Sequence, residues 1–90
     1  MTAAQQQLQA IAQQVQALRD GQGSVDTLIS QSTSAHELRS TLPAAFATVI
    51  DNLTDRLQAS ALFTEESCSF SRTDLIDSLQ LWVDKAQQRL

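Results

Sequence analysis

The chain of 90 residues carries ten acidic side chains against six of Lys and Arg, for a net charge of −4, and 42% of its residues are hydrophobic. About a quarter are Leu, Ile, Val or Phe, too many for a disordered chain, and polar residues interrupt them too often for a membrane span. We therefore expect one globular domain over residues 1–90, which at this length buries roughly 64% of its surface.

Charge and cysteine content restrict the partners and the compartment. The six basic residues are dispersed along the chain, so they form no dense positive patch of the kind that nucleic acid requires. Cys68 is the single cysteine and can form no disulfide within the chain. The first residues lack the basic flank and the apolar run of a signal peptide, and we expect a cytoplasmic protein.

The first eighteen residues contain no charge and seven glutamines, and their apolar residues recur at spacings of four and three. This periodicity predicts an amphipathic helix over 3–20. Its apolar face consists of Ala4, Leu8, Ile11, Val15 and Leu18. Gly21 and Gly23 follow, and glycine favours the end of a helix.

The segment 21–42 is less regular and is expected to be a crossover with one or two short helices between 24 and 41. Ser24 is suited to cap the first of them. Ser34 and Glu37 match the capping-box pattern of the second. The polar residues 31–34 indicate a break between the two, because hydroxyl side chains compete for backbone hydrogen bonds.

Two longer helices are predicted in the second half of the chain. Pro43 suits a first turn, and the residues after it predict a helix over 43–60 with one apolar face. That face consists of Phe46, Val49, Ile50, Leu53 and Leu57. Residues 63–70 are interpreted as a loop, after which Ser71 and Asp74 resemble the cap and first turn of a helix over 72–89.

These three amphipathic faces must cover one another, so the predicted fold is all-α, a small bundle of three main helices. The last two form an antiparallel hairpin over 43–90. Because this hairpin holds all three phenylalanines and the only tryptophan, we expect it to be the more stable half.

The sequence offers little support for catalysis or for a cofactor. A reactive thiol needs a cationic neighbour, whereas Cys68 follows Glu65 and Glu66. His36 is the only histidine and has no metal-ligand spacing to other residues. The acid pairs Asp51/Asp55 and Asp74/Asp77 are expected to face water rather than each other. From these features together we predict a protein that is not an enzyme and that has no metal, no cofactor and no small-molecule substrate.

Two groups of residues are candidates for partner binding. Ala3, Ala10 and Ala17 recur every seven residues outside the apolar face of the first helix, and this alanine seam is narrow enough to receive another helix. They are otherwise simply good helix formers that face water. Leu81 lies away from the apolar face of the last helix and, with Phe63 and Phe70, is a second candidate surface.

We therefore expect a non-enzymatic helical module that binds another protein or itself, with a dimer favoured. One alternative is a small regulator that binds nucleic acid through the short helices between 24 and 42, with Arg39 near the contact. Another is a thiol-dependent activity at Cys68.

Overall fold

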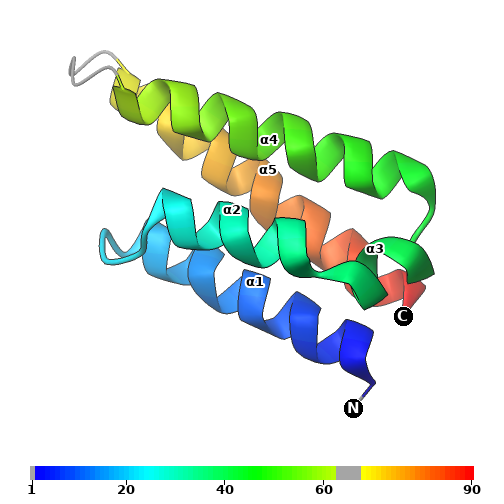
Figure 1. The fold of residues 1–90 in the computed structure, drawn as a ribbon. Coiled ribbons are helices and arrows are strands. Elements are labelled where there is room, and N and C mark those ends of the chain that lie inside the picture. The colour runs from blue at the N-terminus through cyan, green and yellow to red at the C-terminus, as the bar shows by residue number, and fades with distance from the viewer. Residues whose placement is uncertain (1, 63–67) are drawn as a thin grey trace.

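The described part of the chain forms five α-helices, α1 (Ala3–Arg19), α2 (Val25–Ser34), α3 (His36–Thr41), α4 (Ala44–Leu62) and α5 (Cys68–Arg89). The computed structural model describes residues 2–62 and 68–90, with the side chains of 2–59 and 73–90. Helices α1, α4 and α5 form three sides of a bundle, and α2 with α3 forms the fourth (Figure 1). The all-α bundle is confirmed, but the predicted crossover is a complete side of it.

Both ends of α1 are fixed by local hydrogen bonds. The Thr2 hydroxyl accepts from the Gln5 amide at 3.2 Å, and the Gln5 side chain accepts from the Thr2 amide at 3.1 Å, which makes a reciprocal capping box. At the other end Gly21 has a φ of +81°, and the Gln22 amide donates to the Ala17 carbonyl at 2.8 Å. This left-handed turn is the glycine stop that the sequence predicts.

The side of the bundle formed by α2 and α3 differs from the sequence-based expectation in two respects. Residues 31–34 continue α2 instead of interrupting it, and the break falls at Ala35, which is buried. Ser34 does not cap α3, because its hydroxyl donates back to the Ser30 carbonyl at 2.7 Å. Ser24 does cap α2, since its hydroxyl accepts from the Thr27 amide at 3.4 Å.

The C-terminal hairpin contains a longer last helix than predicted. Helix α5 begins at Cys68, so residues 68–70 are not a loop and Ser71 is not an N-cap. The sequence from Cys68 onward contains neither Gly nor Pro, and nothing in it prevents the helix from extending toward its N-terminus. The rest of the predicted loop, 63–67, lies outside the described residues.

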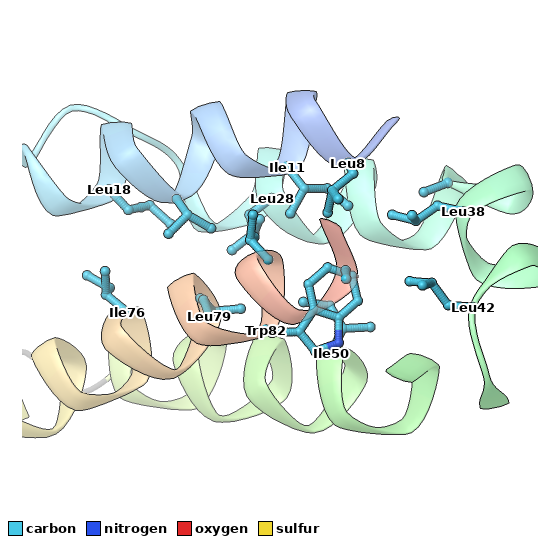
Figure 2. Close-up of a cluster of buried hydrophobic side chains, with 14 of the residues drawn as sticks. Leu8, Ile11, Leu18, Leu28, Leu38, Leu42, Ile50, Ile76, Leu79 and Trp82 are labelled. Atoms are coloured by element: carbon cyan, nitrogen blue, oxygen red, sulfur yellow. The ribbon is translucent and has the colours of Figure 1, made fainter. Parts of the chain in front are cut away.

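One hydrophobic core joins all five helices (Figure 2). Leu8 and Ile11 of α1 and Leu28 of α2 point toward the side of the bundle that carries Leu79 and Trp82 of α5, and Leu38 of α3 lies beside Leu42. The largest completely buried side chains come from both halves of the chain, namely Leu8, Ile11, Val15, Leu28, Leu38, Ile50, Leu57, Leu79 and Val83. Among the side chains that the structure describes, the hairpin therefore contributes no larger share of the core than the first half of the chain.

Candidate interaction surface

Helices α4 and α5 run antiparallel and leave a shallow groove between them on the surface of the bundle. Its volume is about 230 Å³. We call it the α4/α5 groove, and its lining residues are Ala45, Phe46, Val49, Ser78, Leu81, Trp82 and Lys85. The lining is apolar except for Ser78 and Lys85, so the groove suits contact with other apolar side chains.

The floor of the groove is held in place by Phe46 and Trp82. Their rings meet edge to face with centroids 6.1 Å apart, and the Trp82 indole N–H donates to the Phe46 carbonyl at 3.0 Å. The Arg89 guanidinium lies over the Phe46 ring at 6.0 Å from its centroid. Because Trp82 also belongs to the buried core, the floor of the groove is fixed both by the core and by these contacts with Phe46.

The walls of the groove carry two exposed large hydrophobic residues. Val49 is 45% exposed and Leu81 is 60% exposed. Among the described residues, these two are the exposed large hydrophobic ones, and both line the same groove. A single exposed leucine is ordinary on a protein surface, whereas two such residues across one groove form a contiguous apolar patch.

Val49 is a site residue that the sequence reasoning missed. The periodicity predicts it on the buried face of the helix over 43–60, and this prediction is wrong, because Val49 is exposed while Ile50 and Leu57 on the neighbouring side of α4 are buried. Leu81, by contrast, is exposed as its position outside the apolar face predicts. A hydrophobic residue at the edge of a wide apolar face is the signal that could have identified Val49.

Charged residues flank Leu81 along α5. Asp77 lies four positions before it and Lys85 four positions after it, and both are exposed. Asp77 forms an ion pair with Arg19 of α1 at 2.8 Å, and 54% of its side chain stays accessible. Asp84, three positions after Leu81, is exposed as well. The surface around Leu81 is therefore acidic toward the start of α5 and carries one acid and one base toward its end.

The structure does not join the alanine seam to the groove. Ala3 is exposed, while Ala10 and Ala17 are half-buried on α1. Two glutamines on the same side of α1 form bonds within the chain. Gln7 accepts from the Leu38 amide and Gln14 from the Ser24 amide, each at 2.9 Å. This side of α1 therefore borders its own α2 and α3.

The other singled-out residues are distributed over the bundle. Phe63 lies outside the described residues, and the side chains of Phe70 and Cys68 are outside the described part of the chain. His36 is exposed at the start of α3. The acid pairs of α4 and α5 are exposed, as predicted, and the part of the chain that the structure describes contains no cluster of metal-ligating residues.

Arg39, on which the nucleic-acid alternative depends, is engaged within the chain. Its two terminal nitrogens donate to the Asp51 carboxylate at 3.2 and 2.9 Å, and one of them also donates to the Ser32 carbonyl at 3.1 Å. Its side chain is 28% exposed. This bidentate arrangement links α2, α3 and α4 and does not favour phosphate binding by Arg39.

A second hollow lies between the start of α1 and the end of α5. Its volume is about 350 Å³, and its lining consists of Gln5, Leu8, Gln9, Gln87 and Leu90. Glutamines dominate the lining, and Gln5 is occupied by the capping box. We find no group of side chains there that would select a ligand.

Comparisons with known proteins give no relative. The chain matches no protein-family model, and neither a curated protein nor a solved structure is detectably similar to it. None of the described helices is long and apolar enough to cross a bilayer.

Proposed function

We propose that this chain is a non-enzymatic helical module that binds an apolar segment of a protein in the α4/α5 groove. The single observation that carries the proposal is the position of Val49 and Leu81, two exposed hydrophobic residues that face one groove with a fixed aromatic floor. A groove of this kind between two helices accepts hydrophobic side chains spaced along a partner helix.

The groove is preferred to the alanine seam for two reasons. The glutamines Gln7 and Gln14 that border the seam already bind the same chain. Alanine offers little apolar area to a partner, whereas leucine and an aromatic floor offer much more. The seam stays a prediction in its own right, and the proposal does not depend on it.

Photochemical cross-linking tests the proposal directly. A benzophenone amino acid replaces Leu81 in the full chain, and a matched variant carries it at Gln13, an exposed position of α1. In the cells that make the protein, we expect the probe at position 81 to form a protein adduct, and Val49→Glu in the same chain to abolish it. The cross-linked segment is then identified by mass spectrometry and its purified form is tested for binding to the wild type and to Leu81→Glu.

The protein adducts formed at the two probe positions decide the outcome of this experiment. A protein adduct at position 81 that depends on Val49, and that is absent at position 13, supports it. Equal adducts at both positions, or none at position 81, contradict it, because either result removes the groove as the site of contact.

A further inference from the structure

We infer that the partner of the α4/α5 groove is a second copy of this chain, whose α5 packs on α5 along the edge of the groove that Leu81 forms, about a two-fold axis that passes beside Leu81. This inference rests on the proposed function and names its partner. The observation behind it is the order of charged and polar residues along the exposed face of α5 around the exposed leucine.

An antiparallel pairing of two copies of α5 about Leu81 places each residue opposite the one that lies equally far on the other side of the axis. Lys85 then faces Asp77 of the second copy, and Asp77 faces Lys85 of the second copy. One turn further out, Gln88 faces Asp74, and the exposed Asp84 faces Ser78 of the second copy. The pairing therefore sets each Lys85 against an opposite charge and places the remaining acids of this face against neutral side chains.

A parallel arrangement of the two helices is less favourable than this antiparallel pairing. In a parallel arrangement Asp77 would meet Asp77 and Lys85 would meet Lys85, and both contacts repel. Asp77 can serve its own Arg19 and a second cation, because more than half of its side chain stays accessible while it holds that pair at 2.8 Å. Asp84 would likewise meet Asp84 in the parallel arrangement, whereas it meets Ser78 in the antiparallel one. The charges therefore favour the antiparallel two-fold arrangement over the parallel one.

The apolar contribution comes from the centre of the same face. Leu81 meets its own copy on the axis, and Val49 borders the contact from α4. A contact centred on one exposed leucine of each copy is small, and small interfaces are weak. We therefore expect a dimer with a dissociation constant in the micromolar range.

Sedimentation equilibrium of the purified full chain, from about 1 µM to about 500 µM, tests the inference. The wild type should dimerise within this range. Leu81→Glu should raise the dissociation constant at least about thirtyfold, the effect of a residue at the centre of an interface. Gln13→Glu adds the same charge at an exposed position of α1 and should leave the constant unchanged.

A charge exchange tests the two-fold geometry. Lys85→Asp alone places acids opposite each other at two symmetric contacts and should weaken the dimer about tenfold or more. Combining it with Asp77→Lys restores opposite charges across the axis and should return the constant to within about threefold of the wild type. Circular dichroism and thermal unfolding verify that each variant keeps the fold.

Three results would overturn the inference. They are a wild type that stays monomeric at about 500 µM, a Leu81→Glu variant that dimerises as well as the wild type, and a double charge exchange that fails to restore what Lys85→Asp removes. A monomeric wild type together with a cross-link from position 81 to a different protein would reject the second copy while it supports the proposed function. A monomeric wild type with no cross-link would reject both.

Discussion

The side-chain oxygen of Gln7 accepts a hydrogen bond from the Leu38 backbone N–H at 2.9 Å, although 31 positions separate the two residues. Leu38 is the third residue of α3, a six-residue helix whose N-cap, Ala35, has no side chain that can accept a bond. The first amides of a helix have no partner within it, so α3 depends on α1 for this contact. Gln7 thereby connects the Gln-rich first helix to the shortest element of the bundle.

Replacing Gln7 by alanine should therefore destabilise the fold. The Leu38 amide would lose its acceptor in a partly buried position, and we expect a loss of about 1 kcal/mol in the free energy of unfolding. Gln6→Ala is the matched control, because Gln6 is exposed on the same helix and its substitution should change stability by less than about 0.3 kcal/mol. Urea unfolding followed by circular dichroism measures both, and equal losses would contradict the capping role of Gln7.

The two glycines after α1 should respond differently to alanine. Gly21 has a φ of +81° and open space around it, so Gly21→Ala should cost about 1–2 kcal/mol from backbone strain alone. A Cβ at position 23 would lie 2.6 Å from the Gln14 side-chain oxygen and 2.8 Å from the Leu18 backbone nitrogen. Gly23→Ala must displace the loop and break the Gln14–Ser24 bond, and we expect the larger loss.

An asparagine at position 21 separates strain from packing. Asparagine tolerates the left-handed conformation better than alanine, so Gly21→Asn should recover part of the loss. Thermal unfolding of the three variants is the measurement. If Gly23→Ala proved milder than Gly21→Ala, the close packing of the loop on α1 would be refuted.

Leu79 and Leu81 lie two positions apart on α5, so the same substitution by alanine can be compared at a buried and at an exposed position. Leu79 is completely buried, and Leu79→Ala should cost about 2–5 kcal/mol through lost burial and the cavity left behind. Leu81→Ala removes the same atoms from an exposed position and should cost less than about 0.5 kcal/mol. Chemical unfolding at low micromolar protein, where association is weak, should show this difference, and similar losses would mean that the face of α5 is assigned incorrectly.

Local periodicity predicted those parts of the fold that depend on neighbouring residues. The apolar face of α1 is buried as its spacing indicates, and the glycine stop ends the helix where expected. The extent of α2 was not predictable in this way. Ser32 and Ser34 were expected to interrupt a helix, yet their hydroxyls donate to the Ile29 and Ser30 carbonyls inside it at 3.0 and 2.7 Å. The same hydroxyl groups can break a helix or bond within it, and tertiary packing decides.

The candidate site was predictable only in part, for a related reason. Leu81 was identified because it lies far outside the apolar face of its own helix. The exposure of Val49 depends on which side of α4 the other helices cover, and this cannot be predicted from the sequence of one helix. The contact of Gln7 with α3 likewise joins residues far apart in sequence, and no local pattern marks it.

Arg39 and Arg19 provide a second matched comparison. Arg39 makes a bidentate contact with Asp51 and a third bond to the Ser32 carbonyl, which an ammonium group cannot reproduce in the same geometry. Arg39→Lys should therefore cost about 1 kcal/mol. Arg19 contacts Asp77 through one nitrogen in a more exposed pair, and Arg19→Lys should cost less than about 0.5 kcal/mol. Urea unfolding of both variants at low and high salt tests this, and equal losses would contradict a structural role specific to Arg39.

The distribution of buried side chains between α1 and α5 leads to a final prediction about local stability. Sequence alone favoured the C-terminal hairpin as the more stable half, because it contains the aromatic residues. In the structure, however, Leu8, Ile11 and Val15 of α1 are as completely buried as Leu79 and Val83 of α5. Helix α1 packs against α2, α3 and α5, so it cannot separate from the bundle without exposing the shared core.

We therefore expect the central amides of α1 and α5 to exchange with solvent at similar, slow rates, since both should open only when the whole bundle unfolds. Native-state hydrogen exchange measured by NMR, residue by residue, is the experiment. The amides around Ile11 and Val15 should have opening free energies within about 1 kcal/mol of those around Leu79 and Val83. Those of α3, a short helix capped from α1, should open more easily. If α1 exchanged much faster than α5, the hairpin would be a more stable unit by itself, and the shared core would contribute less to stability than its burial implies.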